Sequence, residues 1–306
     1  MSKPDHTKRD LLTLTGHTAG GKTTLAAHLA LHLDGEVISA DSRQVYRGMD
    51  IGTGKDLADY QVGDRNINYH LIDIADAGQK YSLFDFQRDF HAAYEDILSR
   101  GKFPILCGGT GLYAESVLRG YTLAEVPVDE AFRKSISDKP DEELISLLKS
   151  YGPLHNQSDT TSRDRLIRAL EIARSDKPAE PSKIFPPIRS KVFCIIYDTE
   201  TRRRRITQRL TERLENGMIE EVRKLLKSVK PDDLMYYGLE YKYLTLYCTG
   251  KITYEDMFSQ LNIAIHQFAK RQMTWFRGME RRGIPIFWIP GELSLEKKLT
   301  LILTNL

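Results

Sequence analysis

Residues Leu11–Leu33 read LLTLTGHTAGGKTTLAAHLALHL, and this stretch decides the fold. The apolar run Leu11–Thr15 predicts a short buried strand, and Thr23–Leu33 carries a leucine at every fourth residue, which predicts a helix. Between them, Gly16–Thr23 matches the phosphate-binding pattern G-x-x-x-x-G-K-[ST] in full. The motif requires a strand before it and a helix after it, so a P-loop is favoured over a chance glycine turn.

The predicted loop has the chemistry of an anion site. Glycines let the backbone bend so that successive amide N–H groups point at phosphate oxygens, and the following helix adds its positive end. Lys22 would add a positive charge, and the Thr23 hydroxyl could hold Mg²⁺. The motif alone does not separate ATPases, small-molecule kinases and transferases that release pyrophosphate. The residues expected to bind phosphate are Gly16, Thr18, Ala19, Gly20, Gly21, Lys22, Thr23 and Thr24.

Further apolar runs alternate with helical patterns, which predicts an α/β fold with a parallel sheet and helices on both faces. The other predicted strands are Glu36–Ala40, His70–Ile74, Phe103–Cys107, Lys191–Asp198 and Ile284–Ile289. Ser82, followed by Asp85 three residues later, predicts the start of a helix with an apolar stripe. Two long helices are predicted near Arg202–Lys227 and Tyr254–Arg277.

The pattern changes between residues 122 and 190, where the chain is polar and rich in proline. Within this stretch, Asp141–Ser150 and Ser162–Arg174 are predicted helices. We therefore expect a P-loop NTPase-like catalytic core formed by residues 1–121 and 191–306, and an inserted helical subdomain formed by residues 122–190.

Composition excludes several classes of protein. A chain of 306 residues that is 41% hydrophobic and 28% charged is not disordered, and a net charge of +2 demands no nucleic-acid partner. Cys107, Cys194 and Cys248 form no CxxC pair, and the histidines show no metal-ligand spacing. The first ten residues lack an apolar signal segment and no apolar run could span a bilayer, so we expect a cytoplasmic protein without membrane association.

Two polar segments follow predicted strands and should lie at the ligand-binding edge of the sheet. Asp41 follows the strand Glu36–Ala40 and could act as a general base or touch magnesium through water, although a helix N-cap or a solvated loop charge is the alternative. The turn Gly108–Gly111 could bring backbone close to a ligand, or could simply be tight. Apart from Asp73 and the terminal Asp198 of Lys191–Asp198, no predicted strand carries an acidic residue where a Walker B site would need it, which disfavours an NTP-hydrolysing motor.

Basic residues gather in three places. Arg205 and Arg209 are four apart on a predicted helix and share a face, from which one or both could reach an anion. Each of the other two clusters has two interpretations: its residues contact nucleic acid, or they occupy ordinary exposed or core positions. Their members are Arg163, Arg165 and Arg168, and Lys270, Arg271, Arg277, Arg281 and Arg282 with Trp275 and Phe276.

Taken together, these motifs resemble the bacterial tRNA dimethylallyltransferases. The resemblance rests on GHTAGGKT at residues 16–23, DSRQVY at 41–46, GMDIGT at 48–53, GGTGLY at 108–113, RLIRALE at 165–171 and AKRQMTWF at 269–276. It extends from about Leu11 to Trp288, and DSRQVY with GGTGLY is far more specific than the P-loop alone.

The resemblance implies transfer of a dimethylallyl group from dimethylallyl diphosphate to the exocyclic amine of the adenosine 3′ of the anticodon. Asp41 would take the proton of that amine. The loop amides, Lys22, Mg²⁺ on Thr23 and Arg205 would stabilise the leaving pyrophosphate. Thr110 would help to orient the base or the donor.

The resemblance also implies a tRNA partner, gripped at the anticodon stem-loop by shape and charge, and a monomeric enzyme. The residues matching tRNA-contact positions are Asp41, Ser42, Arg43, Gln44, Asp164, Arg165, Leu166, Ile167, Arg168 and Gly238, the last within the segment 233–238. The chain departs from the family pattern at His17 and Gly20, at residues 154–163, and at Gly238–Tyr241, where GLEY replaces G-Y-[KR]-[EQ].

Three other functions fit parts of the pattern. An adenylate isopentenyltransferase would use the same chemistry on free AMP, ADP or ATP, but the inserted helices and Asp41-Ser42 favour tRNA. A small-molecule kinase would leave DSRQVY and GGTGLY unexplained. A non-catalytic RNA-binding protein would have no need of intact Lys22, Thr23 and Asp41.

Overall fold

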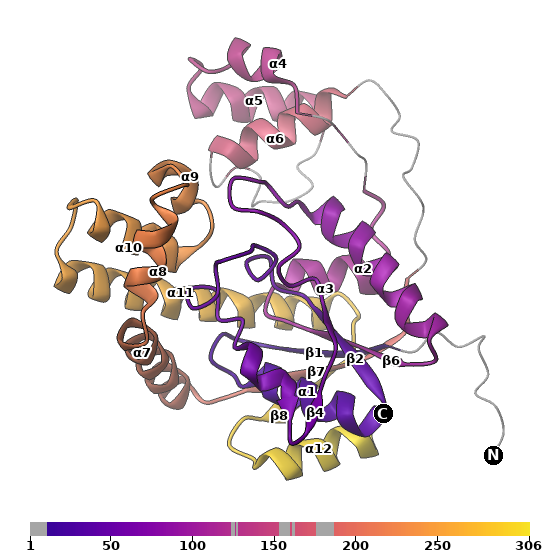
Figure 1. Ribbon diagram of the computed structural model, residues 1–306. Helices are drawn as coiled ribbons and strands as arrows, with labels where there is room; N and C mark the ends of the chain where they lie inside the picture. Colours follow the sequence, from indigo (N-terminus) through magenta and orange to yellow (C-terminus); the bar gives the residue numbers. More distant parts are fainter. Residues whose placement is uncertain (1–10, 124–125, 127, 153–159, 161–162, 176–186) are drawn as a thin grey trace. The chain divides into compact units, whose positions relative to one another are not determined.

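The computed structural model describes residues 11–123, 126, 128–152, 160, 163–175 and 187–306 (Figure 1). The chain divides into two compact units, one formed by residues 1–119 and 187–306 and the other by residues 120–186. The insertion predicted at 122–190 covers nearly the same residues as the second unit. Among the described residues, no helix is long and apolar enough to cross a membrane.

The first unit is built on a six-stranded parallel sheet with the strand order β5-β2-β6-β1-β7-β8. The strands are β1 (Leu11–Gly16), β2 (Gly35–Ser39), β5 (Tyr69–His70), β6 (Phe103–Cys107), β7 (Ser190–Ile196) and β8 (Ile286–Pro290). A separate antiparallel pair joins β3 (Gln61–Val62) to β4 (Arg65–Asn66). Because β1 pairs with both β6 and β7, the segment after β1 leaves the sheet near its centre.

The predicted strand His70–Ile74 is wrong in extent. Only Tyr69–His70 pairs with β2, and the chain then turns, with φ of 61° at Leu71 and 57° at Asp73. These left-handed conformations cannot continue a strand. Asp73 is not an open carboxylate of the Walker B kind either, because it forms an ion pair with the buried side chain of Lys55.

Helices cover both faces of the sheet, as predicted (Figure 1). On one face, α1 (Lys22–Leu33) and α12 (Leu295–Thr304) pack against side chains of the strands such as Leu14. On the other, α2 (Leu83–Ser99), α3 (Gly111–Leu118) and the C-terminal half of α11 (Tyr254–Arg281) pack against side chains such as Ile38. Ser82 and Asp85 form the predicted capping box at the start of α2.

A third apolar core lies among α7 (Thr199–Glu215), α8 (Met218–Leu225), α9 (Pro231–Met235), α10 (Leu239–Cys248) and the N-terminal half of α11. The single helix predicted at Arg202–Lys227 is therefore wrong. It breaks at Gly217, whose φ of 95° ends α7 and allows α8 to begin. The other predicted long helix is confirmed as α11, a helix of 28 residues.

The second unit contains α4 (Glu130–Ser135), α5 (Asp141–Tyr151) and α6 (Arg163–Arg174). Its small core includes Leu144 and Leu166. The predicted helix Asp141–Ser150 is confirmed, and α6 agrees with the second prediction except for Ser162, which lies outside the described residues. Most of the divergent segment 154–163 also lies outside them.

Candidate active site at the phosphate loop

The loop between β1 and α1 has the backbone conformation that its glycines predict. Gly16 has φ of 146°, Ala19 of 61° and Gly21 of 73°. A Cβ at Gly16 would lie 2.9 Å from the carbonyl oxygen of Ile195, so this position also needs glycine for packing. The amide N–H groups of Ala19, Gly20 and Gly21 donate no hydrogen bond to any described residue. The loop therefore presents free donors beside the N-terminus of α1, which is the arrangement that binds phosphate.

Cationic side chains from α1 and α7 surround the loop. Lys22 Nζ donates to the carbonyl oxygen of His17 at 2.8 Å, and Arg205 Nε donates to that of Ala19 at 3.0 Å. Arg209 donates to the hydroxyl of Thr18. Arg205 and Arg209 thus reach the same loop from one face of α7, as their spacing of four residues predicts.

No carboxylate among the described residues contacts Lys22, Arg205 or Arg209 directly. Burial lowers the pKa of Lys22, and burial together with the nearby Arg213 guanidinium lowers the pKa of Arg209 to about 9. Buried cations are expensive unless they are paired, so the site favours an anionic ligand.

Asp41 lies on the ligand side of the sheet. Its neighbour Ala40 joins two strand ends, because Ala40 N donates to Cys107 O at 2.8 Å and Thr110 N donates to Ala40 O at 3.1 Å. Asp41 Oδ1 accepts from Arg43 N at 2.9 Å. Its negative charge raises the pKa of Lys22, against the larger effect of burial, and also acts on Arg209. The carboxylate therefore shares an electrostatic environment with the phosphate loop.

The glycines of the turn after β6 are explained by packing. A Cβ at Gly108 would lie 2.2 Å from Ala40 O, and one at Gly109 would lie 2.5 Å from Gln272 Nε2. The Thr110 hydroxyl accepts from Ser42 N at 3.1 Å, so it holds the segment that carries Asp41. Of the two interpretations left open by the sequence, the tight turn accounts for the glycines, and Thr110 remains beside the site.

Gln272 joins the phosphate loop to this turn and was missed by sequence reasoning. Its Oε1 accepts from Thr18 N at 2.9 Å, and its Nε2 donates to Gly109 O at 2.9 Å. The side chain is only 7% exposed. The available signal was an amide on the otherwise apolar stripe of α11 formed by Ala269, Met273 and Phe276. Phe276 is core, and Trp275 packs against Gly111, so these aromatics belong to the fold.

His17 is a structural part of the loop. It is fully buried, its Nδ1 lies 2.6 Å from Thr18 O, and its ring packs edge-on to Tyr197 at 5.6 Å between centroids. Burial lowers the pKa of His17 to about 4, so the ring is neutral at pH 7 and adds no charge to the cation cluster. The Arg205 guanidinium lies 4.9 Å from the centre of the same Tyr197 ring, so Tyr197 contacts both His17 and Arg205.

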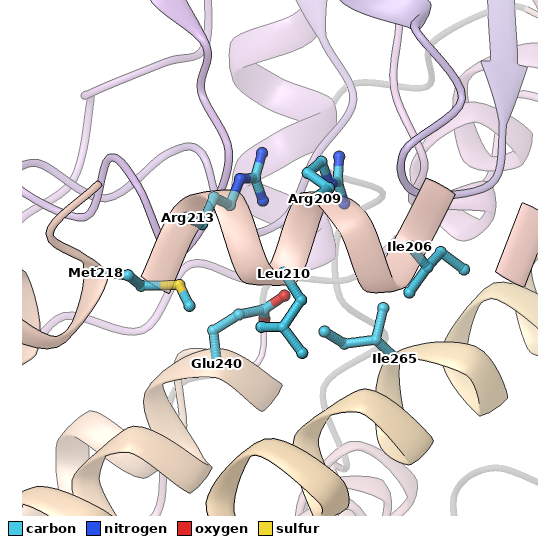
Figure 2. A pocket seen from close by; sticks show the side chains of 7 residues that line it. All are labelled: Ile206, Arg209, Leu210, Arg213, Met218, Glu240 and Ile265. Atoms are coloured by element: carbon cyan, nitrogen blue, oxygen red, sulfur yellow. The ribbon is translucent and has the colours of Figure 1, made fainter. Parts of the chain in front are cut away.

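A small hollow of about 10 Å³, about what one water molecule needs, lies beside Arg209 and Arg213 of α7, and Figure 2 shows its lining. Arg209 and Arg213 extend from α7, and Glu240 of α10 points its carboxylate toward that helix (Figure 2). Burial raises the pKa of Glu240. Glu240 belongs to the segment GLEY that departs from the family pattern, so this departure places an acid near the cations. The lining residues are Ile206, Arg209, Leu210, Arg213, Met218, Glu240 and Ile265.

The residues predicted to contact tRNA differ in how much surface they offer. The Gln44 side chain is engaged internally, since it accepts from Ser39 Oγ at 2.9 Å and donates to Gly54 O at 2.9 Å. Gly238 has φ of 141° and lies beside Arg43, whose Cδ would be 3.8 Å from an added Cβ. Asp41, Ser42 and Arg43 are half-buried.

In the second unit, the prediction for Leu166 is corrected. This side chain is 1% exposed and packs in the core, because it lies on the apolar face of α6. Arg163 is bound to Asp141, and Arg168 contacts both Glu171 and Val126 O at 2.6 Å. The exposed neighbours Asp164 and Arg165, and the half-buried Ile167, remain the accessible part of this helix.

The residue at this loop that could hold a metal ion is Thr23. Within the described residues, no group of three or more His, Cys, Asp or Glu side chains could hold a metal ion. Magnesium commonly keeps several waters and binds through one or two protein oxygens and the phosphates of a substrate. Thr23, half-buried in the first turn of α1 beside Lys22, provides one such oxygen.

The fold and the loop define a P-loop-like α/β protein with a cationic phosphate site. The chain belongs to the IPP transferase family, whose model matches residues 44–279. It is 55% identical over 305 residues to tRNA dimethylallyltransferase 2 of Bacteroides fragilis strain YCH46, covering 99% of this chain and 98% of that protein. It is 58% identical over 291 residues to tRNA dimethylallyltransferase 1 of Porphyromonas gingivalis strain ATCC 33277, covering 94% and 96%.

Solved structures agree with this assignment. The full-length tRNA isopentenylpyrophosphate transferase of Bacillus halodurans is 31% identical, with a TM-score of 0.71 and coverage of 97% of this chain and 95% of that chain. A eukaryotic dimethylallyltransferase acting on tRNA is 25% identical, with a TM-score of 0.67 and coverage of 93% and 74%. The family resemblance and the P-loop fold predicted from the sequence are confirmed.

Proposed function

We propose that this chain is a tRNA dimethylallyltransferase, which moves the dimethylallyl group of dimethylallyl diphosphate to the exocyclic amine of the adenosine 3′ of the anticodon. Membership of the IPP transferase family and the full-length relatives named for this activity support the proposal. The observation that carries it is the cluster of Lys22, Arg205 and Arg209 around free loop amides, with the negative charge of Asp41 acting on Lys22 and Arg209. Such a site can bind a diphosphate and place a proton acceptor, the Asp41 carboxylate, beside it.

In the proposed reaction, the adenine amine attacks the first carbon of the dimethylallyl group while the bond from that carbon to the diphosphate oxygen breaks. The electron pair of that bond leaves with the pyrophosphate, whose growing charge the loop amides, Lys22, Arg205 and Arg209 stabilise. Asp41 accepts the proton that the amine loses, which is worth roughly 10²–10⁴ in rate. Thr110 keeps the backbone that carries Asp41 in place through Ser42.

We propose Mg²⁺ as the cofactor, held by Thr23 and by diphosphate oxygens. When bound, the ion supplies positive charge that neutralises the diphosphate. Thr23 follows Lys22 at the start of α1, so the residue that would hold the ion and the residue that would grip the phosphate are adjacent. Measuring pyrophosphate affinity with and without Mg²⁺ tests this assignment.

The proposed partner is the anticodon stem-loop, with contacts from Asp41–Gln44, from the exposed face of α6 and from the segment at Gly238. We propose that the enzyme works as a monomer in the cytoplasm, where its tRNA substrate is found. The Thr110 hydroxyl accepts from Ser42 N, and the backbone N–H of Arg43 donates to Asp41, so the side chains of Thr110 and Arg43 are offered as further contacts of the acceptor nucleotide.

One experiment separates this function from its rivals. The enzyme is incubated with dimethylallyl diphosphate, Mg²⁺ and either unmodified tRNA or AMP, and the nucleosides are analysed by mass. A further reaction of each kind contains ATP, whose consumption is followed. Prenylated adenosine from tRNA is the expected product. Faster prenylation of AMP would instead identify an adenylate isopentenyltransferase, and phosphate transfer from ATP without prenylation would identify a kinase.

A further inference from the structure

Tyr236 is an exposed aromatic residue flanked by positive charge. It lies between α9 and α10 and keeps 45% of its surface exposed. The Arg43 guanidinium lies 5.7 Å from the centre of its ring, and Lys80 Nζ lies 5.8 Å from it. Within the described residues, neither Arg43 nor Lys80 forms an ion pair with a carboxylate. An aromatic ring beside two unpaired cations offers stacking and phosphate contacts together.

The ring is held in place from beneath. Tyr236 packs edge-on to Tyr237 at 5.7 Å and 84°, and Tyr237 packs edge-on to Tyr46 at 4.5 Å. Tyr237 is 2% exposed, and its hydroxyl accepts from Gly78 N at 2.5 Å and donates to Gln79 O at 3.2 Å. Because its support is buried and hydrogen-bonded, Tyr236 presents a surface that loses little freedom on binding a planar group.

This surface borders the candidate active site. Arg43, which contacts Tyr236, donates its backbone N–H to Asp41 at 2.9 Å. Gly238 adjoins the same arginine, with its added Cβ 3.8 Å from Arg43 Cδ. A nucleotide that delivers its amine to Asp41 would therefore bring its neighbours in the RNA loop close to Tyr236.

We propose that Tyr236 is a stacking platform for an unpaired base of the RNA loop that carries the acceptor adenosine, with Arg43 and Lys80 contacting the adjoining phosphates. Unpaired bases are commonly recognised by stacking on aromatic side chains, and every base has a face for this contact. The identity of the RNA rests on the proposed function, whereas the stacking contact rests on the geometry of Tyr236, Arg43 and Lys80.

The test is binding of an unmodified anticodon stem-loop RNA to wild type, Y236A and Y236F, with Y254A as a control. Tyr254 is a similarly exposed tyrosine, at 41%, with no cation beside its ring among the described residues. We expect Y236A to raise Kd by about 5- to 150-fold, whereas Y236F, which keeps the ring, and Y254A stay within about twofold of wild type. K80A should weaken binding and reduce its dependence on salt.

A second comparison identifies the base. Each loop nucleotide is replaced in turn by an abasic one, and the affinities of wild type and Y236A are measured. At one position the abasic substitution should weaken binding to wild type by the same factor as Y236A, and should have no further effect on Y236A. Equal losses for both proteins at every position, or a Y236A affinity equal to that of wild type, would overturn the platform.

Failure of the proposed function would look different. If wild type binds the stem-loop through Tyr236 but prenylates neither it nor intact tRNA, the platform stands and the activity falls. If wild type prenylates the RNA and Y236A binds it with unchanged affinity, the activity stands and the platform falls. Y236L, which keeps an apolar side chain without a ring, should behave like Y236A and so excludes an effect of lost volume.

Discussion

Replacing Gln272 by leucine should loosen the phosphate loop without removing any charge from it. The substitution keeps a side chain of similar size but abolishes both hydrogen bonds, to Thr18 N and to Gly109 O, each 2.9 Å long. Gly109 is buried and Thr18 half-buried, so both backbone groups lose a partner that water replaces only in part. An unsatisfied buried group costs about 1–3 kcal/mol, so we expect Q272L to lose about 2–4 kcal/mol of unfolding free energy.

Urea unfolding at pH 7 measures the free energy of unfolding, and calorimetric titration measures the affinity of the loop for pyrophosphate. Because Thr18 lies within the loop that the bridge supports, pyrophosphate affinity should fall together with stability. The matched control is Q267L, on an exposed position of the same helix, which should stay within about 0.5 kcal/mol of wild type.

Two results would refute this reasoning about Gln272. If the free energy of unfolding of Q272L stays within about 0.5 kcal/mol of wild type, the two hydrogen bonds of Gln272 only offset the cost of burying its amide. Lost stability with unchanged pyrophosphate affinity would mean that Gln272 supports the core without positioning the loop.

The remaining predictions concern charge and protonation at the site. D41N should lower kcat by about 10²–10⁴ while tRNA still binds; single-turnover prenylation and filter binding check this, and near-normal turnover would remove Asp41 as the base. R209M should weaken pyrophosphate binding about 10- to 150-fold by the loss of a charged hydrogen bond, against little change in R204M, an exposed arginine of the same helix. For His17, the folded pKa of about 4 lies below the unfolded value near 6.5, so the unfolded state binds a proton first. Stability should therefore fall by roughly 3 kcal/mol as the pH drops from about 6.5 to 4, and H17Q should lack this part of the loss in pH-dependent urea unfolding.

The elements that the sequence predicted are those governed by local rules. The strand, loop and helix at Leu11–Leu33 follow from a continuous apolar run, a glycine motif and a leucine repeat. The shared face of Arg205 and Arg209 follows from helical spacing alone. Each of these needs information from only a few neighbouring residues.

The errors arose where one backbone angle or a distant contact decides. Gly217 inside a helical pattern could have been tolerated, yet its left-handed φ splits α7 from α8. Leu71 and Asp73 also adopt left-handed angles, which no periodicity reveals, and they end β5 after two residues. Gln272 contacts a loop 254 residues away, so only the folded chain shows what it does.

The surplus of positive charge around the phosphate loop has a consequence for turnover. Lys22, Arg205 and Arg209 have no carboxylate among the described residues to hold them once the chemistry is over, so they attract inorganic pyrophosphate as well as the diphosphate of the donor. Binding that is equally strong before and after reaction does not raise kcat. Released pyrophosphate should therefore compete with dimethylallyl diphosphate for the phosphate loop. The turnover rate in the cell would then depend on how fast pyrophosphate is hydrolysed by other enzymes.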